Sequence, residues 1–579
     1  MNCYYASEVM RRLAGRFERL YGAAAERCME RLAMLVGRYG VEAQSAPPPA
    51  RWDQSTAVLI AYGDMLRGPG EPPLATLARF LDAHVRGLCS HVHVLPFFPY
   101  SSDDGFSVIH FRQVNPELGT WREIEALAAR FGLMADLVLN HVSSRSKWFG
   151  EFMLGVAPAR DYFITVDPAA DLSAVVRPRS SPLTTPVATA GGIRQVWTTF
   201  SADQVDLNYA NPDVLFEMLD IVLFYISCGV RVIRLDAIGY LWKRIGASCL
   251  HLPETHEIVK ILRDFLQIVA PHVLLVTETN VPHAENVSYF GEGDEAHVVY
   301  QFALPPLLLH AFLSGTSRHL AAWVSGLADL PPGCTFLNFT ASHDGIGVRP
   351  LEGLLDEASL AWIVERVQHG GGRVSMCKGP TGALRPYELN ATWFDALNAG
   401  ENDAAESECR RFLSSQAVML ALRGIPAVYF NSLLGARNDH LLAEKTGLAR
   451  ALNRTKWELS ALERLLNDPA ARERRIWEGY RRLLAARGRL RALHPDGAQR
   501  VIDAGDAVFG FVRQAPDGAE RLLSLTNLGR VPCGIPGAVL GPLGLRTGSG
   551  EDAIAGAPLK WRGDELLLDA LDTVWIVLP

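Results

Sequence analysis

Residues 229–249, GVRVIRLDAIGYLWKRIGASC, begin as a buried strand and become polar where that strand should end. The run of Val and Ile is typical of a strand inside a protein core. It ends in Arg234 and Asp236, and a buried charge is unfavourable unless it is paired. An ion pair at a strand end is often purely structural, so these two residues alone do not decide between a structural and a chemical role.

Similar apolar runs recur along the chain, with helix-like segments between them. Most are apolar throughout, which is typical of parallel strands covered on both faces. Eight such strands alternating with helices predict an α/β fold, a (β/α)8 TIM barrel. The expected strands are residues 56–64, 90–98, 132–141, 229–236, 272–278, 296–302, 334–344 and 424–430, with helices such as 253–269 and 305–325 between them.

The barrel does not account for the whole chain. Residues 145–200, rich in Pro, Ser and Thr, are too long for a simple loop and predict an inserted subdomain after strand 3, over the barrel mouth. Residues 345–400 are a candidate second insertion. Alternating apolar residues and turns predict a C-terminal antiparallel β domain at 495–579. Residues 1–50 are expected to be a helical extension that leads into the linker SAPPPARWD (45–53), which leaves 51–144 and 201–494 for the barrel.

Composition excludes several classes of protein. The net charge is −7 and the basic residues are scattered, so we expect no nucleic-acid partner. Nine Cys without a CxxC pair indicate reduced thiols in a cytoplasmic protein rather than a disulfide framework or a zinc site. The charged N-terminus has no apolar core of a signal peptide, and no stretch reaches ~18 apolar residues, so neither export nor membrane insertion is expected.

Polar residues gather at the predicted strand ends. In a TIM barrel the active site lies at the carboxyl ends of the strands. His141 ends the third strand, Asp236 the fourth and Glu278 the fifth, while His343 and Asp344 end the seventh. Either histidine alone could be a core residue or a cap. Three carboxylates converging on one mouth, however, suit glycosyl transfer.

Each carboxylate fits one step of a retaining glycosidic reaction, which needs a nucleophile and a proton donor ~5–5.5 Å apart. Asp236 suits the nucleophile, because Arg234 lies two residues back on the same strand face and can keep it ionised. Glu278 follows the apolar LLVT, which would raise its pKa and keep it protonated as the general acid. Asp344 would bind sugar hydroxyls and stabilise charge in the transition state.

Four ordered motifs resemble those of the α-amylase superfamily, glycoside hydrolase family 13: DLVLNH (136–141), GVRVIRLD (229–236), VTE (276–278) and ASHD (341–344). Longer stretches, among them HVLPFFPYSSDDGFSV, RPRSSPLTT and RLDAIGYLWKRIGASC, are similar to the sucrose phosphorylase group of that family. The resemblance covers residues 56–579 and is more specific in these longer stretches than in the four short motifs.

The resemblance implies transfer of an α-glucosyl unit from a small glucoside to inorganic phosphate, giving α-glucose 1-phosphate by double displacement. Asp236 would be the nucleophile, Glu278 the acid/base and Asp344 the transition-state stabiliser, with no cofactor or metal. The remaining residues expected around the glucosyl unit are Asp103, Phe106, His141, Phe200, Gln204, Arg234, Tyr240, His343 and Arg450.

The chain departs from the sucrose phosphorylases where the acceptor should bind. In TGALRPYELN (381–390) those enzymes typically have Asp and Gln around the Tyr, whereas here Arg385 and Glu388 flank Tyr387. An Asp-to-Arg change reverses the local charge, which favours an anionic aglycone. Val176 also replaces an expected Tyr. Arg179 and Arg385 are therefore candidate ligands for a carboxylate or for phosphate, although either could instead pair with a neighbouring acid.

These departures and the N-terminal extension make the chain most like the glucosylglycerate phosphorylases of the group, so 2-O-α-glucosylglycerate is the favoured donor. Sucrose, sucrose 6-phosphate and glucosylglycerol remain open as donors. An α-glucoside hydrolase or transglucosidase and a non-catalytic amylase-fold protein are the alternatives from other classes. A homodimer is expected by analogy alone.

Overall fold

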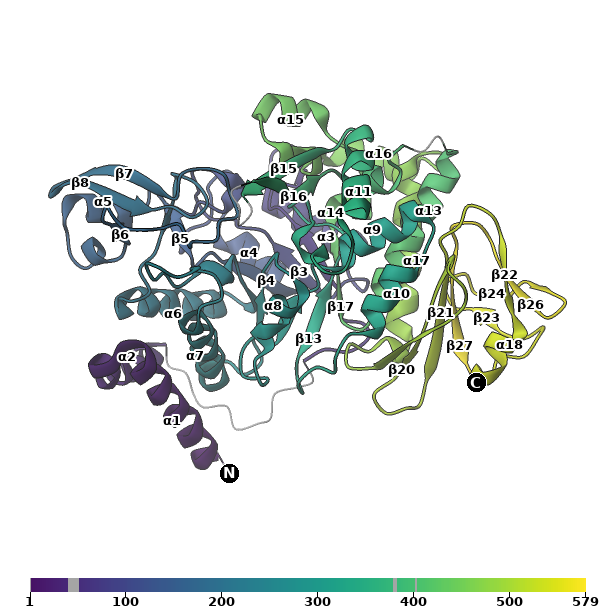
Figure 1. Ribbon diagram of the computed structural model, residues 1–579, viewed down its shortest axis with the longest axis horizontal. Helices are drawn as coiled ribbons and strands as arrows, with labels where there is room; N and C mark the ends of the chain where they lie inside the picture. Colours follow the sequence, from purple (N-terminus) through teal and green to yellow (C-terminus); the bar gives the residue numbers. More distant parts are fainter. Residues whose placement is uncertain (1, 40–50, 379–382, 401–402) are drawn as a thin grey trace.

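Eight parallel strands close into a barrel at the centre of the molecule (Figure 1), as the sequence predicts. The computed structural model describes residues 2–39, 51–378, 383–400 and 403–579, so residues 45–50 of the expected linker lie outside the described residues. Around the barrel the order is β1-β3-β4-β10-β11-β12-β13-β17, and β17 pairs with β1. The strands are β1 (Val58–Ala61), β3 (His91–Val94), β4 (Gly132–Leu137), β10 (Val230–Leu235), β11 (Leu274–Thr277), β12 (Val298–Tyr300), β13 (Thr335–Asn338) and β17 (Ile425–Tyr429).

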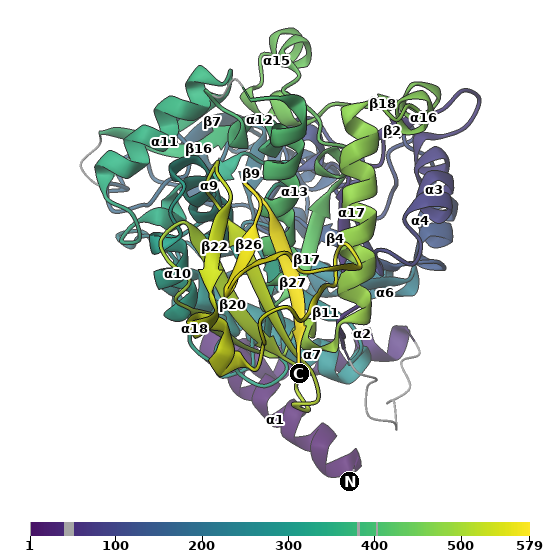
Figure 2. The ribbon, with the colours of Figure 1, turned by 90° about the vertical axis from the view of Figure 1, so that its right-hand side faces the viewer.

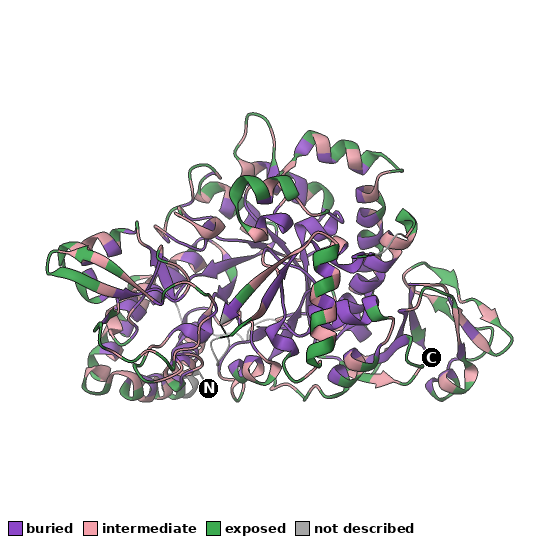
Figure 3. Cartoon of the chain, turned by 45° about the horizontal axis from the view of Figure 1, so that its top comes forward, coloured by how far each residue is buried: buried purple, intermediate pink, exposed green. Residues whose placement is uncertain are grey.

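Helices cover the outside of the barrel, and the barrel strands that they enclose are almost entirely buried (Figure 3). This burial on both faces explains why the strand sequences are apolar throughout. The single helix expected at 305–325 is wrong, because Gly315 adopts φ 71° and ends the first helix in a left-handed turn. The main helices are α3 (Pro73–His84), α4 (Trp121–Ala128), α6 (Pro212–Ser227), α7 (Pro253–Val269), α9 (Leu304–Ser314), α10 (Arg318–Ser325), α13 (Ala405–Ala421) and α17 (Arg472–Arg489).

All eight barrel strands are shorter than expected, and for two of them this decides where the polar residues lie. β4 ends at Leu137 and β13 ends at Asn338. His141 instead begins β5 (His141–Ser143), which leaves the barrel and pairs antiparallel with β9 (Gln204–Asp206). The polar residues after strands three and seven therefore lie outside the barrel strands, His141 on β5 and His343 and Asp344 on a loop.

Two segments that follow barrel strands build small sheets at the mouth. Residues 145–200 contain α5 (Lys147–Leu154) and a sheet of β6 (Thr165–Val166), β8 (Gly192–Trp197) and β7 (Thr184–Thr189). The small core of this segment, Val166, Leu183 and Trp197, is completed by Cys249, the last residue of the stretch 229–249. The second sheet joins β14 (Ile346–Gly347), β16 (Leu384–Asn390) and β15 (Arg373–Lys378), next to α11 (Glu357–His369).

The C-terminal residues form the expected antiparallel sheets, packed beside α13 and α17 (Figure 2). Buried Arg513 joins them to the barrel by donating hydrogen bonds to the carbonyl oxygens of Ala421 (2.6 Å) and His494 (2.7 Å). One sheet contains β19 (Ala498–Ile502), β20 (Val508–Gln514), β21 (Arg521–Asn527), β27 (Thr573–Leu578), β23 (Glu551–Asp552) and β24 (Ala557–Pro558), and the other β22 (Cys533–Pro536), β26 (Glu565–Leu568) and β25 (Trp561–Arg562).

Shorter elements complete the chain. β2 (Leu66–Arg67) pairs with β18 (Trp457–Glu458) beside the barrel. The short helices are α8 (His283–Val287), α12 (Trp393–Leu397), α14 (Phe430–Leu433), α15 (His440–Thr446), α16 (Leu459–Asn467) and α18 (Gly537–Leu540). No helix in the described ranges combines the length and the apolar character needed to span a bilayer. All cysteines whose side chains the structure describes are free thiols.

The N-terminal helices, α1 (Asn2–Tyr21) and α2 (Ala25–Arg38), pack against α7 and α6, which are the two helices that flank β10. Val9, Leu13 and Phe17 form a buried stripe at helical spacing. Ion pairs fix the contact, because Asp264 on α7 accepts hydrogen bonds from Arg16 Nε (2.8 Å) and Arg12 Nη2 (2.7 Å). The N-terminal helices thus support α6 and α7, the helices that flank β10, and Asp236 directly follows β10.

Neutralising Asp264 is expected to loosen these helices. Asp264 is 1% exposed, and removing one member of a buried pair typically costs on the order of 3 kcal/mol. Asp264→Asn should therefore lower the melting temperature and make residues 2–38 more sensitive to protease. Asp329→Asn, at a fully exposed residue that pairs with Arg423, is the matched control. Equal melting temperatures for the two variants would contradict this account.

Candidate active site

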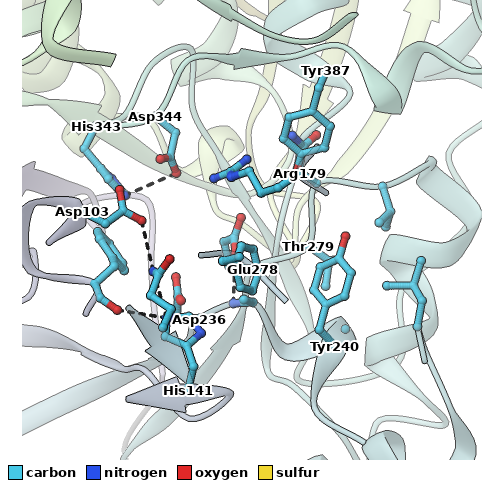
Figure 4. Close-up of a pocket in the computed structure, with 18 of the residues that line it drawn as sticks. Asp103, His141, Arg179, Asp236, Tyr240, Glu278, Thr279, His343, Asp344 and Tyr387 are labelled. Carbon is cyan, nitrogen blue, oxygen red and sulfur yellow. Dashed lines mark hydrogen bonds and ion pairs between the residues drawn. The ribbon is translucent and has the colours of Figure 1, made fainter. Parts of the chain in front are cut away.

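A cavity of about 640 Å³, counting its open mouth, lies at the carboxyl ends of the barrel strands (Figure 4). Its wall comes mainly from loops that follow the barrel strands, together with residues of β5, β9 and β16. The structure brings most of the predicted site residues into this wall. They are Asp103, Phe106, His141, Arg179, Phe200, Gln204, Asp236, Tyr240, Glu278, His343, Asp344, Tyr387 and Arg450.

Arg234 lies behind the cavity wall and is 2% exposed. Its Nη1 donates to Asp236 Oδ1 at 2.8 Å and to Asp136 Oδ1 at 2.5 Å. Asp136 faces Arg234 because β4 and β10 pair in register at these two residues. The other oxygen of Asp136 is 2.7 Å from His93 Nε2, from the neighbouring strand β3. Asp236 is thus held from behind by a charge network that spans three strands.

The sequence reasoning missed Asp136 and His93 as parts of the site. The signal was present, because both are polar residues inside strands that are otherwise apolar. Burial alone would raise the pKa of Asp136, but the charges of His93 and Arg234 outweigh it and hold that pKa below its ordinary value. Asp136 therefore remains an anion inside the barrel.

Glu278 is joined to Asp236 through the turn that follows β10. The N–H of Ala237 donates to Glu278 Oε2 at 3.1 Å, and Ala237 adopts a left-handed φ of 50°, which is strained for a residue with a side chain. Arg234 Nη2 is 3.8 Å from the same oxygen. The turn therefore sets two carboxyl groups next to one guanidinium.

The two carboxyl groups have different surroundings. Burial raises the pKa of Asp236 and also that of Glu278, and each is raised further by a neighbouring carboxylate. Arg234 counteracts both shifts, but it bonds Asp236 directly at 2.8 Å and reaches Glu278 only at 3.8 Å. This difference favours the negative charge on Asp236 and the proton on Glu278.

Asp344 lies across the cavity and is paired with Arg450, whose Nη1 is 2.6 Å from Asp344 Oδ1. Burial alone would raise the pKa of Asp344, but the charges of Arg450 and Arg454 hold it well below its ordinary value. The other edge of Arg450 makes two hydrogen bonds of 3.0 Å to Glu388. Glu388 therefore lies behind Arg450 and orients it, rather than lining the cavity.

The wall between Asp236 and Asp344 is formed by stacked and hydrogen-bonded rings. Phe106 stacks on His343, with ring centroids 4.8 Å apart and an interplanar angle of 6°. His141 Nε2 is 3.0 Å from the carbonyl oxygen of Phe106. Gln204 bonds both His141 (3.2 Å) and Asp103 (3.3 Å). Burial lowers the pKa of His343 and of His141, so both rings are neutral.

The opposite lobe of the cavity is aromatic and cationic. Tyr240 and Tyr387 lie on the side of Glu278 that faces away from Asp103 and His343 (Figure 4). The guanidinium carbon of Arg179 is 5.7 Å from the Phe200 ring centroid and 5.8 Å from that of Tyr387. Burial raises the pKa of Tyr387 to about 12, so its hydroxyl stays protonated.

Arg385 is placed differently from Arg179. Its Nη1 is 2.9 Å from Glu352 Oε1, and within the described part of the chain it does not line the cavity. Its role toward an aglycone stays a prediction. His251, Thr279 and Asn280 do line this lobe and were not predicted. Only the position of the last two, directly after Glu278, could have indicated them.

The described residues include no group of three or more His, Cys, Asp or Glu side chains arranged to hold a metal ion. The cavity instead offers two neighbouring carboxyl groups, of which Arg234 bonds Asp236 directly, and a third, ionised carboxylate opposite. A nucleophile paired with a proton donor is what substitution at an acetal carbon requires.

Comparisons with known proteins agree with this chemistry. The family model described as "Alpha amylase, catalytic domain" matches residues 87–324. A glucosylglycerate phosphorylase from Spirochaeta thermophila is 48% identical over 84% of this chain and 83% of that protein. One from Allomeiothermus silvanus is 48% identical over 86% and 89%. The crystal structure of sucrose 6F-phosphate phosphorylase from Thermoanaerobacter thermosaccharolyticum superposes with a TM-score of 0.71 and 26% identity, covering 82% of this chain and 94% of that one.

Asp136→Asn is expected to destabilise the barrel by on the order of 3–5 kcal/mol, because it leaves the charge of Arg234 less compensated at a buried position. Since the pKa of Asp136 is lowered in the folded protein, its contribution is complete above the unfolded carboxyl pKa of ~3.9 and is lost as pH falls below that value. Urea unfolding of both proteins at pH 7 and at about pH 2.5, well below the unfolded carboxyl pKa, measures this. A difference between the proteins that does not shrink on acidification would contradict it.

Proposed function

The chain belongs to the α-amylase family, within its glycoside phosphorylases, and we propose that it transfers an α-glucosyl unit from 2-O-α-glucosylglycerate to inorganic phosphate. The products are α-glucose 1-phosphate and glycerate. The observation that carries the proposal is the placement of Asp236 and Glu278 around Arg234, which favours an ionised nucleophile beside a protonated acid. The names of the two relatives at 48% identity support the choice of donor.

In the first step, Asp236 attacks the anomeric carbon of the glucosyl unit. The bond from that carbon to the glycerate oxygen breaks, and Glu278 donates its proton to the departing oxygen. Arg234 keeps Asp236 ionised and aimed at the carbon through the 2.8 Å hydrogen bond. The result is a glucosyl ester on Asp236, a free glycerate and an ionised Glu278.

In the second step, an oxygen of inorganic phosphate attacks the same carbon. The ester bond breaks and its electron pair returns to Asp236 as a carboxylate. Glu278 regains its proton from the phosphate or from solvent, so the enzyme is restored. Each displacement inverts the carbon, and two inversions give the α-configuration again.

The glucosyl unit is proposed to lie between Asp236 and the wall formed by His343, Asp344 and Arg450. A carboxylate kept ionised by Arg450 stabilises the positive charge that develops on the sugar ring. The remaining predicted residues on this side, Asp103, Phe106, His141 and Gln204, offer ring faces and polar atoms to the hydroxyl groups.

The aglycone and phosphate are proposed to use the other lobe in turn, beside Arg179, Tyr240 and Tyr387. Successive binding of the aglycone and of phosphate in the same lobe is consistent with double displacement, because the aglycone leaves before phosphate attacks. A cytoplasmic location is also a proposal, supported by the free cysteines. A homodimer is proposed by analogy only.

The donor is tested with a panel of 2-O-α-glucosylglycerate, sucrose, sucrose 6-phosphate and glucosylglycerol, each with and without phosphate. We expect glucose 1-phosphate to form only when phosphate is present, and most rapidly from glucosylglycerate. Enzymatic assays of glucose 1-phosphate and of free glucose measure the outcome. Release of free glucose at one rate regardless of phosphate would instead identify a hydrolase.

Glu278→Gln and Asp236→Asn separate the two proposed roles. Without its acid, Glu278→Gln should lose about 10²- to 10⁴-fold on glucosylglycerate but much less on α-glucosyl fluoride, whose leaving group needs no proton. Asp236→Asn should lose activity on both donors. Because the pKa of Glu278 is raised, wild-type kcat/KM on glucosylglycerate should fall as pH rises through that pKa. Equal losses of Glu278→Gln on the two donors would refute its role as the acid.

A further inference from the structure

Arg349 is a buried cation without a hydrogen-bond partner. It begins the short helix η6 (Arg349–Leu351) after β14 and is 9% exposed. Its guanidinium donates no hydrogen bond to any residue that the structure describes. The carboxylate paired with it is Glu352, with Oε1 3.5 Å from Nε. Nε is therefore buried with only this long ion-pair contact, and the terminal nitrogens make no hydrogen bond within the described residues.

The other buried arginines around the cavity are held by hydrogen bonds. Arg234 donates to two carboxylates, and Arg450 makes a bidentate contact with Glu388. Arg454 donates to the carbonyl oxygen of His343 at 2.9 Å and pairs with Asp104. A buried guanidinium without such partners is unfavourable, so an unsatisfied one next to a cavity indicates a missing ligand.

Arg349 is fixed beside the aromatic lobe by its backbone. The N–H of the preceding residue, Val348, donates to the carbonyl oxygen of Tyr387 at 3.1 Å, and β14 pairs with β16. Burial raises the pKa of Tyr240, and Tyr387 raises it further, whereas the charges of Arg349 and Arg179 oppose the shift. The charges of Arg349 and Arg179 therefore both act on the hydroxyl of Tyr240.

The nearest carboxylate behind this lobe, Glu285, is paired with His251, with Oε2 3.2 Å from Nε2. Apart from Glu278, its described lining residues are uncharged or cationic. Burial lowers the pKa of His251 to about 4, so that ring is neutral. Asn280 Oδ1 is buried without a hydrogen-bond partner and packs on Gly347, where an added Cβ would lie 2.3 Å away. The lobe is thus positive and has unused polar groups.

Arg385 competes with Arg349 for the carboxylate of Glu352. Glu352 is shared by the two arginines, but it lies closer to Arg385 Nη1 (2.9 Å) than to Arg349 Nε (3.5 Å). Arg385 is therefore the main ion-pair partner of Glu352. Arg349, like Arg385, is not part of the cavity wall within the described residues. No hydrogen bond holds its terminal nitrogens, however, so rotation of its side chain would bring the guanidinium toward the cavity beside Tyr240 and Tyr387.

We propose that Arg349 binds the carboxylate of the aglycone and so determines the specificity of the enzyme for anionic acceptors, with Arg385 acting on it only through Glu352. This inference rests on the proposed function. A carboxylate presents two oxygens in a plane that match the forked donors of a guanidinium, which a neutral polyol lacks. A positive lobe also favours an anion of either kind, so the glycerate carboxylate and inorganic phosphate must be tested separately.

The experiment uses the reverse reaction, with α-glucose 1-phosphate as donor and phosphate release as the readout. D-Glycerate and glycerol are the acceptor pair, since they differ by the carboxylate. Arg349→Gln should lose about 10- to 100-fold in kcat/KM with glycerate, the effect expected for a charge-assisted hydrogen bond, but less than about threefold with glycerol. Arg349→Lys should recover part of the loss because it keeps the charge.

Three further measurements complete the design. Arg318→Gln, at an exposed arginine on α10 paired with Asp506, is the matched control and should leave both acceptors unaffected. Arg385→Gln should show a smaller discrimination than Arg349→Gln. The KM for phosphate, measured with α-glucosyl fluoride as donor, should be unchanged in Arg349→Gln. Melting temperatures of all variants confirm that they fold.

The outcomes separate this inference from the proposed function. Equal losses of Arg349→Gln with the two acceptors, a larger discrimination by Arg385→Gln, or a raised KM for phosphate alone would each overturn the role of Arg349. A wild-type enzyme that forms glucose 1-phosphate from phosphate and a glucoside but shows no preference for glycerate over glycerol would also overturn it, while leaving the phosphorylase reaction intact. Absence of glucose 1-phosphate from every donor would refute the proposed function itself.

Discussion

The buried guanidinium of Arg234 is the interaction on which the site depends. A cation inside a barrel is tolerable only when anions surround it, and here they come from different strands: Asp136 on β4, Asp236 at the end of β10 and Glu278 after β11. The same contacts that compensate the cation also place the carboxyl groups. Stability of the barrel and the geometry of the reacting groups are therefore not separable at this point.

The additions to the barrel are arranged around the same strand. The N-terminal helices pack on α6 and α7, the helices before and after β10. The sheet in residues 145–200 completes its small core with Cys249, from the loop that follows β10. The left-handed turn at Ala237 lies between these supports and directs its N–H onto Glu278. A strained turn persists only where its surroundings fix it, and both flanks of β10 are fixed.

Much of this architecture follows from local sequence, because apolar runs covered on both faces have few alternatives to a parallel strand. The positions of Asp236 and Glu278 were predictable for the same reason, since each directly follows such a run. The remaining features depend on contacts between distant segments. Gly315 ends a helix that apolar periodicity would continue, and Asp136 acquires its importance only when the β4–β10 register sets it opposite Arg234. Arg349 could not be identified from sequence, because its significance is that it makes no hydrogen bond within the described part of the fold.

Strand β16 carries Tyr387 and Glu388 in succession, and adjacent residues of a strand point to opposite sides. Tyr387 faces the cationic lobe, while Glu388 orients Arg450 and, through it, Asp344. Attempts to engineer acceptor preference by grafting this hairpin from a relative would therefore also disturb the sugar-ring side of the cavity. Such a graft should therefore preserve the Glu388–Arg450 contact or replace both residues together.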